Sequence, residues 1–315
     1  MESKEVMSSP IVKSEPLISV IIVSWNTKTE LRNCLTSLYE RNKDIPFEAF
    51  VVDNASEDGS PEMVDEDFPE VKLLRNAENL GYSRANNQAI KLVKTQYILL
   101  LNSDTEFKTD GSLSKTYSFI KEKSDLGIVG VRLVFPDGSL QAAGRDFVTV
   151  WSLFKSQLLF SRSRFVIKIK SRLYHKNNSM PYETDYVDGA FLFFRKEVVD
   201  QIGLMNEKYF LYGEDMEWCL RASRAGWKIS VFPQVEIVHH QGKSSVQNLS
   251  LALQENLVNI CQFIKEVYGT GKGQFSYLIY LTGMLIRAGL LFLPKREKAI
   301  SYWEAFTNCL NKKVI

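Results

Sequence analysis

Short apolar runs and helical apolar spacing alternate along the first hundred residues. Leu17–Val23 is a continuous, mostly β-branched run (L-I-S-V-I-I-V), which is typical of a strand buried on both faces. Apolar residues then recur at helical spacing between positions 31 and 38. This alternation continues and predicts parallel βαβ units with right-handed crossovers. The further strands predicted here are Phe47–Val52, Val71–Leu74 and Tyr97–Leu101. A short helix is predicted to begin at Ser60, and a separate helix is predicted over Tyr82–Val93.

The second half of the chain has a less regular pattern. Amphipathic spacing predicts a long helix over Leu249–Tyr268, and a shorter one is predicted over Gly213–Ala225. We therefore expect an α/β protein with a nucleotide-binding first half and a mixed second half. The strands predicted in the second half are Gly127–Phe135, Tyr186–Phe194, Trp227–Phe232 and Val235–His239.

Composition mainly excludes classes of protein. The chain has 315 residues, 45% hydrophobic and 24% charged, as in ordinary globular proteins. Its 39 basic and 37 acidic residues give a formal net charge of +2, so the overall charge does not favour a nucleic-acid partner. The four cysteines form no CxxC pair, which fits reduced thiols in the cytoplasm. Residues 1–16 are predicted to be a disordered leader and not a secretory signal.

Polar residues cluster at the predicted carboxyl ends of three strands. The clusters are Ser24–Asn26, Asp53–Ser60 and Asn102–Asp104. Any one of them is also compatible with ordinary turn chemistry, since Asn, Asp, Ser and Gly are turn-forming residues. Ligands bind at this edge of open α/β sheets, so three clusters on successive strands favour a ligand site. A dinucleotide site is excluded because S-W-N stands where G-x-G-x-x-G would be needed, and no Walker lysine loop is present.

Asp104 and the pair His239–His240 are the candidate metal ligands. Asp104 directly follows a predicted buried strand, where its carboxylate can bind a hard divalent cation; a turn or helix N-cap is the alternative role. The adjacent histidines follow a later strand, and one of them can offer a neutral imidazole to the same metal. No third or fourth nitrogen or sulfur ligand is evident, which argues against a structural zinc site.

The densest cluster of acids is the segment Y-F-L-Y-G-E-D-M-E-W at residues 209–218. Its three acids, Glu214, Asp215 and Glu217, fall in the first turn of a predicted helix, where they also interact favourably with the helix dipole. The aromatic residues around them argue against a purely solvated face. A carboxylate partly desolvated by aromatic walls has a raised pKa, which suits a general base.

Seven blocks in order resemble glycosyltransferase family 2, and more narrowly its bacterial rhamnosyltransferase-like branch. The resemblance covers roughly residues 17–246. It implies a GT-A fold with a mixed, mainly parallel sheet, and an inverting enzyme that uses a nucleotide-diphosphate sugar and Mg²⁺ or Mn²⁺. The blocks are S-V-I-I-V-S-W-N, V-V-D-N-A-S-E-D-G-S, N-L-G-Y-S-R-A-N-N, L-L-L-N-S-D-T, D-G-A-F-L-F-F-R, F-L-Y-G-E-D-M-E-W and H-H-Q-G-K-S.

The family pattern then assigns roles to single residues. Asp215 matches the general base, and Glu214 beside it is expected to orient the acceptor or the base. Asp104 stands at the last position of the family's D-x-D, whose first position is Asn102 here, so Asp104 alone is the expected carboxylate ligand. His239, and not His240, has the spacing of the metal-contacting histidine.

The resemblance also implies which residues bind the nucleotide sugar. Asp53 and Asn54 are expected near the base and ribose. Arg84 is expected near the diphosphate, although a surface ion pair explains it equally well. The full set predicted to bind the nucleotide sugar is Ser24, Asn26, Asp53, Asn54, Arg84, Asn102 and Ser103.

Two segments predict a peripheral membrane contact. Residues 147–182 carry seven basic residues and no acidic one, interleaved with aromatic and aliphatic side chains. Tyr277–Leu293, within a predicted helical extension 247–315, is a 17-residue apolar stretch just short of a comfortable span. An amphipathic helix that packs on the domain is the alternative for the basic segment. A lipid-linked acceptor at the inner face of the cytoplasmic membrane would account for both segments.

The leading hypothesis is an enzyme that transfers a sugar to a polysaccharide or lipid-linked glycan precursor. Rhamnose, or another deoxyhexose or hexose, is expected from the resemblance, with mannose, glucose and galactofuranose as other donor sugars. A non-catalytic nucleotide-sugar-binding subunit is the rival from another class. The joint presence of Asp104, Asp215 and His239 argues against it. A nucleotidyltransferase is disfavoured because no Gly-rich phosphate loop follows the first strand.

Overall fold

The computed structural model describes residues 15–159, 180–241 and 249–311. Almost all of the predicted leader, residues 1–16, lies outside the described residues. So do most of the basic segment 147–182 and the end of the H-H-Q-G-K-S block.

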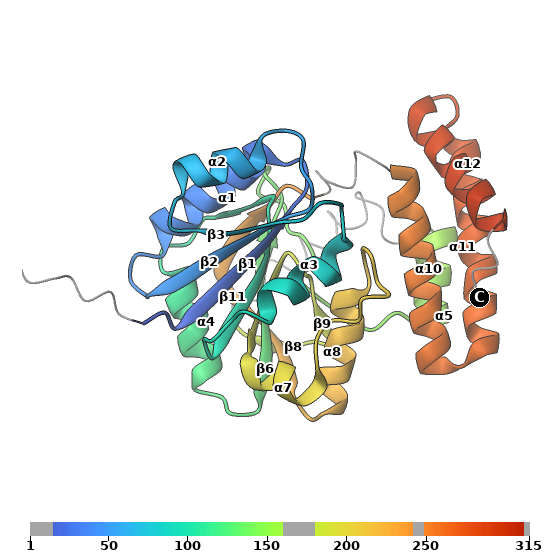
Figure 1. Ribbon diagram of the computed structural model, residues 1–315. Coiled ribbons are helices and arrows are strands. Elements are labelled where there is room, and N and C mark those ends of the chain that lie inside the picture. The colour runs from blue at the N-terminus through green and yellow to red at the C-terminus, as the bar shows by residue number, and fades with distance from the viewer. Residues whose placement is uncertain (1–14, 160–179, 242–248, 312–315) are drawn as a thin grey trace, which may run out of the picture.

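Among the described residues, the centre of the fold is a nine-stranded sheet with helices on both faces (Figure 1). The first four strands along the chain pair in parallel, and the sheet is mixed beyond them. This architecture confirms the predicted α/β class. In spatial order the strands are β3 (Lys72–Arg75), β2 (Phe47–Asp53), β1 (Ile18–Ser24), β4 (Tyr97–Asn102), β10 (Phe191–Arg195), β6 (Leu126–Val134), β11 (Lys228–His239) and β5 (Thr105–Phe107), with β8 (Tyr182–Glu183) paired to β11.

The direction of the strands decides which loops meet. β10 is antiparallel to both β4 and β6, whereas β11 is parallel to β6 and antiparallel to β5. The carboxyl ends of β1, β2, β4 and β11 and the amino end of β10 therefore lie at one edge. Beside this sheet, β7 (Gly144–Arg145) and β9 (Tyr186–Val187) form a two-stranded ribbon.

Helices cover both faces of the sheet. α1, α2 and α4 lie on one side, and α3, α7 and α8 lie on the other (Figure 1). Phe194 of β10 packs edge-on against Trp218, with ring centroids 4.7 Å apart, and so fixes the acid-bearing helix to the sheet. The bounds are α1 (Lys28–Arg41), α2 (Ser60–Asp67), α3 (Gly81–Ile90), α4 (Ser112–Lys121), α7 (Lys196–Ile202) and α8 (Glu214–Arg224).

Three of the predicted strands are wrong in extent. The run Tyr186–Phe194 splits into β9 and β10, because a turn is closed by the hydrogen bond from Phe191 N to Asp188 O at 3.3 Å. Conversely, the two strands predicted on either side of Pro233 form the single strand β11. A shift in the pairing with β6 between Phe232 and Glu236 accommodates the proline, which has no N–H to donate.

A second group of helices stands beside the sheet domain (Figure 1). It consists of α5 (Val150–Leu158), α10 (Leu249–Tyr268), α11 (Thr270–Leu291) and α12 (Arg296–Asn311). α11 packs against the other three. Arg287 of α11 donates to α5, to Ser156 O at 2.9 Å and to Gln157 Oε1 at 2.8 Å. The described start of the basic segment and the C-terminal extension therefore pack as one group.

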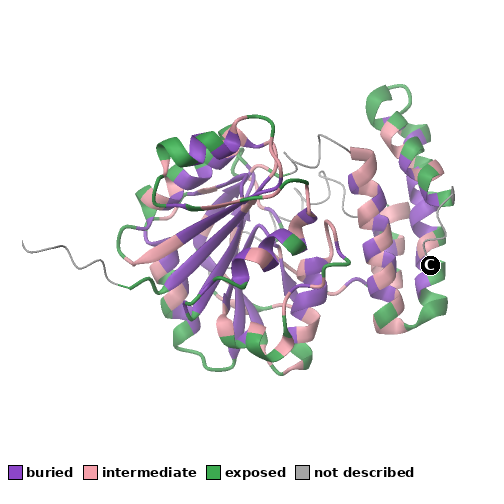
Figure 2. Ribbon diagram, viewed as in Figure 1, coloured by how far each residue is buried: buried purple, intermediate pink, exposed green. Residues whose placement is uncertain are grey.

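α11 begins before the predicted apolar stretch and has 22 residues. By length and composition alone, it is the one described helix that could cross a membrane. Its inner face is buried between neighbouring helices, while its outer face is apolar and exposed (Figure 2). Exposed large apolar side chains on α11, on α12 and in the turn between them are Phe275, Leu278, Leu285, Ile286, Leu290, Phe292, Leu293, Ile300, Trp303 and Leu310.

Candidate active site

The predicted polar clusters meet at the edge where the strands end. Ser24 lies opposite Asp53 in the β1–β2 pairing, and Val23 lies opposite Asn102 in the β1–β4 pairing. On the other side of β10, His239 ends β11 and lies opposite Thr105 of β5. The parallel strands therefore bring together clusters that are far apart in sequence.

Asp53 has room for a ligand, whereas its neighbour Asn54 is occupied. The side chain of Asp53 is buried, and its Oδ2 accepts the backbone N–H of Ser56 at 2.9 Å. Its Oδ1 has no hydrogen-bond partner within the described part of the chain. Such a buried acceptor has capacity for a ligand donor. Asn54 donates to Gly81 O at 3.2 Å and accepts from Asn76 Nδ2 at 2.9 Å, so it holds the adjoining loops together.

Three other predicted donor-binding residues shape the loops at this edge of the sheet. The buried hydroxyls of Ser24 and Ser103 lie 3.0 and 2.9 Å from the Thr27 hydroxyl, on either side of it. Asn26 adopts a left-handed backbone (φ 51°), and its Oδ1 accepts the N–H of Glu57 at 2.8 Å. These contacts fix the loops after β1, β2 and β4 relative to one another.

Arg84 forms the surface ion pair that was its alternative explanation. Its Nε lies 3.3 Å from Glu207 Oε2, and both side chains are exposed. The role of Arg84 at the diphosphate stays a prediction.

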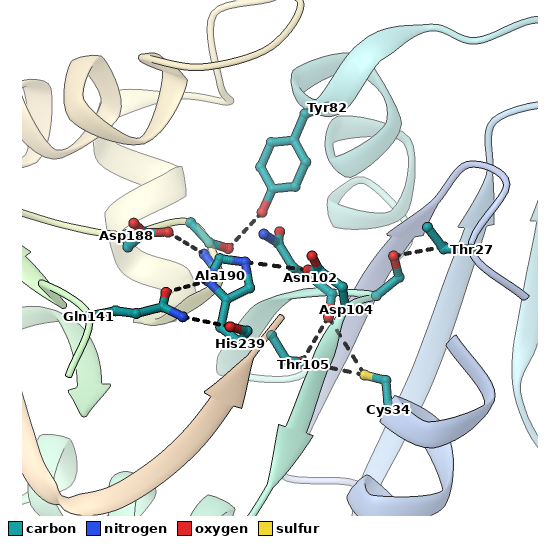
Figure 3. Close-up of polar contacts among 12 residues, drawn as sticks. Thr27, Cys34, Tyr82, Asn102, Asp104, Thr105, Gln141, Asp188, Ala190 and His239 are labelled. Atoms are coloured by element: carbon teal, nitrogen blue, oxygen red, sulfur yellow. Dashed lines mark hydrogen bonds and ion pairs between the residues drawn. The ribbon is translucent and has the colours of Figure 1, made fainter. Parts of the chain in front are cut away.

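The candidate metal ligands lie side by side at the ends of β4 and β11 (Figure 3). Asp104 Oδ1 is 3.4 Å from His239 Nε2, and both side chains are less than a tenth exposed. Two donors that occupy adjacent positions of an octahedral cation at 2.0–2.1 Å lie about 3 Å apart, so the spacing fits shared coordination. His240 instead points to Glu106, with Nε2 at 2.9 Å from Oε1. Of the two histidines, His239 is the one whose ring lies beside Asp104. Its role as a metal ligand stays a prediction from the family resemblance.

The electrostatics of this pair also fit a cation. Burial opposes protonation of His239, but the hydrogen bond to Asp104 and its negative charge outweigh burial and raise the pKa of the imidazole. A positive charge is thus favoured between the two side chains. Among the described residues, no group of three or more His, Cys, Asp or Glu side chains is placed to hold a metal ion. The oxygen and nitrogen donors of the Asp104–His239 pair are of the kind that suits Mg²⁺ or Mn²⁺.

The two candidate catalytic acids open α8, directly after Gly213 in a left-handed conformation (φ 90°). Asp215 accepts two backbone hydrogen bonds, from Gly189 N at 3.1 Å and from Met216 N at 2.7 Å. Burial, together with the negative charge of Asp188, raises the pKa of Asp215 to about 6. A carboxylate with this pKa is ionised at neutral pH and remains basic enough to accept a proton.

Glu214 differs from Asp215 in ionisation. Its side chain is buried, and within the described structure its Oε2 has no hydrogen-bond partner. Burial and the neighbouring charge of Asp215 raise the pKa of Glu214 well above its usual range. The surroundings of Glu214 therefore favour its neutral form.

A comparison with family models assigns the chain to a family. The model for glycosyl transferase family 2 matches residues 19–203, more than half of the chain. The chain belongs to glycosyl transferase family 2.

Relatives of this glycosyltransferase share about a quarter of its residues. The N-acetylglucosaminyl-diphospho-decaprenol L-rhamnosyltransferase of Mycobacterium tuberculosis is 25% identical over 243 residues, 73% of this chain and 78% of that protein. The dTDP-rhamnosyl transferase RfbF of Shigella flexneri is 24% identical over 234 residues, 73% of this chain and 71% of RfbF. The protein y4gI of Sinorhizobium fredii is 27% identical over 240 residues, 74% of this chain but only 25% of y4gI.

Solved structures extend the likeness to the fold. Mannosyltransferase PcManGT from Pyrobaculum calidifontis, solved with GDP-Man and Mn²⁺, superposes with a TM-score of 0.59 and 16% identity. The alignment covers 95% of this chain and 88% of PcManGT. The glycosyltransferase thus has the GT-A-type fold that the resemblance implied.

The structure adds residues to the glycosyltransferase site that sequence reasoning did not single out. Arg145 Nη2 pairs with Asp188 Oδ2 at 2.9 Å. Tyr82, labelled in Figure 3, donates its hydroxyl to Gly189 O at 2.9 Å. Gln141 contacts His239, as described below. Asp188, Gly189 and Tyr82 stand inside two of the seven sequence blocks, whereas Arg145 and Gln141 stand in none of them.

Proposed function

We propose that this protein is an inverting glycosyltransferase that transfers a sugar from a nucleotide-diphosphate donor to a hydroxyl of a glycan precursor. The observation that carries the proposal is the meeting of two groups at one sheet edge: the Asp104–His239 pair and the ionisable carboxylate of Asp215. The first fits a divalent cation and the second fits a general base. We further propose residues 17–246 as the catalytic domain and residues 247–315 as a helical extension.

The residues divide the chemistry between donor and acceptor. Asp104 and His239 would hold Mg²⁺ or Mn²⁺, which when bound neutralises charge on the leaving diphosphate. Asp53, through its free oxygen, would accept a hydrogen bond from the nucleoside. Asp215 would take the proton of the acceptor hydroxyl as that oxygen attacks the anomeric carbon from the opposite face. A single displacement inverts the anomeric configuration, so no covalent sugar–enzyme intermediate is needed.

Rhamnose is the donor sugar that we propose first. Its support is that two of the relatives bear rhamnosyltransferase names, one of them with a dTDP-linked donor. A polyprenyl-diphosphate-linked acceptor is proposed on the same ground. The alternatives are mannose, glucose or galactofuranose as donor sugar, and a non-catalytic nucleotide-sugar-binding subunit.

We also propose a peripheral contact with the inner face of the cytoplasmic membrane, made by the outer face of α11 and α12. The apolar side chains of this face are flanked by exposed basic residues at both ends of α11: Lys272, Lys295, Arg296 and Lys298. Such a face fits an anionic lipid surface, where apolar groups enter the headgroup region and basic groups meet the phosphates. Because α11 is packed along α5, α10 and α12, it would lie on the bilayer and not cross it.

The test is a panel of nucleotide sugars with the full-length protein and Mn²⁺ or Mg²⁺. Binding is measured by thermal shift, and slow donor hydrolysis or transfer by release of nucleoside diphosphate. We expect the highest turnover with dTDP-rhamnose, and NMR of the product should show the inverted anomer. Retention of configuration would refute the mechanism. Tight donor binding without any turnover, on a lipid-diphosphate acceptor as well, would support the non-catalytic alternative instead.

A further inference from the structure

Gln141 makes contacts that fix the orientation of its side-chain amide. It is buried in the segment between β6 and β7. Its Nε2 donates to His239 O at 2.5 Å and to Val134 O at 3.3 Å. Backbone carbonyls only accept hydrogen bonds, so the amide nitrogen must face them. The Oε1 of Gln141 is therefore the atom that lies 2.9 Å from His239 Nδ1 (Figure 3).

This orientation determines which imidazole nitrogen carries the proton. An amide oxygen is only an acceptor, so Nδ1 of His239 must donate to it. In the neutral ring Nε2 then has a free lone pair, and that lone pair faces the Asp104 carboxylate at 3.4 Å. Two acceptors facing each other in a buried site repel unless a positive charge lies between them. Free imidazole prefers the opposite tautomer, with the proton on Nε2.

We infer that Gln141 is a positioning residue that holds His239 in the Nδ1–H tautomer and thereby presents Nε2 to a divalent cation shared with Asp104. The inference deepens the proposed function and rests on its metal site. Partners of this kind orient metal-binding imidazoles and raise their basicity, and their loss weakens metal affinity by about 10–100-fold. Gln141 and His239 are 98 residues apart, so neither local sequence pattern indicates the pairing.

Two substitutions separate this role from a merely structural one. Gln141→Met and Gln141→Glu both remove the amide donor to the two backbone carbonyls. Only Gln141→Glu keeps an oxygen acceptor opposite Nδ1, whether its carboxyl group is ionised or protonated. A packing defect common to both variants cannot produce a difference between them.

The tautomer is read directly from long-range ¹H–¹⁵N spectra of full-length protein labelled at histidine nitrogens. Spectra are taken over a pH series up to about pH 10, because the pKa of His239 is raised and the tautomer is defined only for the neutral ring. The His239 signals are identified by their loss in His239→Asn. We expect Nδ1–H in the wild type and in Gln141→Glu, and a shift to Nε2–H in Gln141→Met. Retention of Nδ1–H in Gln141→Met would overturn the inference.

The second readout is Mn²⁺ affinity in the presence of dTDP, followed by the electron paramagnetic resonance signal of free Mn²⁺. We expect Gln141→Met to bind about 10–100-fold more weakly and Gln141→Glu to bind within a few-fold of wild type. Equal binding by Gln141→Met and wild type would refute the positioning role. Unchanged Mn²⁺ binding in His239→Asn would instead refute the proposed metal site. The tautomer spectra do not depend on that site, so the two failures can be told apart.

Discussion

Asp215→Asn should strongly slow the chemistry and, at neutral pH, stabilise the fold. The substitution keeps the shape of the side chain and removes the proton acceptor. Loss of a general base typically costs about 10²–10⁴-fold in rate. Because the pKa of Asp215 is about 6, kcat/KM of the wild type should rise with pH up to about that value and then level off. The residual activity of Asp215→Asn should lack this limb, and donor affinity should stay within a few-fold.

The stability effect follows from the direction of the pKa shift. Burial raises the pKa of Asp215 from 3.8 to about 6, so the folded state binds the proton more tightly than the unfolded state. Between these two values the unfolded state holds fewer protons, and the free energy of unfolding falls as pH rises. The full shift corresponds to about 3 kcal/mol, lost by about pH 7.

Asparagine carries no charge and so avoids the cost of burying an ionised carboxylate, but its side chain has one hydrogen-bond acceptor fewer. Asp215 accepts hydrogen bonds from Gly189 N and Met216 N, and the amide nitrogen of Asn can accept neither. The lost bond costs about 1 kcal/mol at any pH. Asp215→Asn should therefore be more stable than wild type by about 2 kcal/mol at about pH 8, and less stable by about 0.5 kcal/mol at about pH 4.

Urea unfolding at both pH values, with rates from the nucleotide-sugar panel, tests the two effects together. If the difference in unfolding free energy between Asp215→Asn and wild type has the same sign at both pH values, Asp215 is not a desolvated carboxylate. An active Asp215→Asn would remove it from the base role, whatever its stability.

Three further predictions concern the rest of the machinery. Glu214→Gln should lose less than about tenfold in turnover, because the surroundings of Glu214 favour its neutral form and glutamine is a near-isostere of the protonated acid. A dead Glu214→Gln beside an active Asp215→Asn would reverse the two roles. Asp104→Ala should abolish Mn²⁺-dependent binding of dTDP in calorimetry while leaving the thermal melt in place, and unchanged affinity would exclude Asp104 from the metal site. The protein should float with anionic liposomes more than with neutral ones, and the double substitution Lys295→Glu and Lys298→Glu should weaken this flotation. Binding that resists high salt and alkaline carbonate would mean that α11 is inserted and not peripheral.

Strands β1, β2 and β4 were predictable because most of their residues are buried, so the local sequence is apolar over their length. All residues of β1 except Val23 are buried, so its side chains are apolar on both faces and the run L-I-S-V-I-I-V predicts it. Parallel pairing then follows from the intervening helices, and it brings Ser24, Asp53 and Asn102 to one edge. This part of the site needs no information beyond strand order and direction.

The rest of the site depends on contacts between distant segments. The turn after β9 is held by Asp188, and the strand through Pro233 is held by a shift in its pairing with β6; neither is visible in periodicity. The Arg145–Asp188 ion pair joins residues 43 positions apart on the two-stranded ribbon side of the sheet. Patterns of single residues indicate what a segment buries, but they do not indicate which distant partner it meets.

The reversed strand β10 is the element that connects the two halves of the proposed chemistry. Because it runs antiparallel to β4, its amino end lies at the ligand edge, and Gly189 and Ala190 precede it there. Gly189 N donates to Asp215, and Ala190 O accepts from the backbone N–H of Asn102 at 3.2 Å, two residues before Asp104. The segments that carry the proposed base on α8 and the proposed metal ligand after β4 are thus held through consecutive backbone groups of one turn. A backbone link of this kind fixes the two segments relative to one another, as the orientation of groups for a single in-line displacement requires.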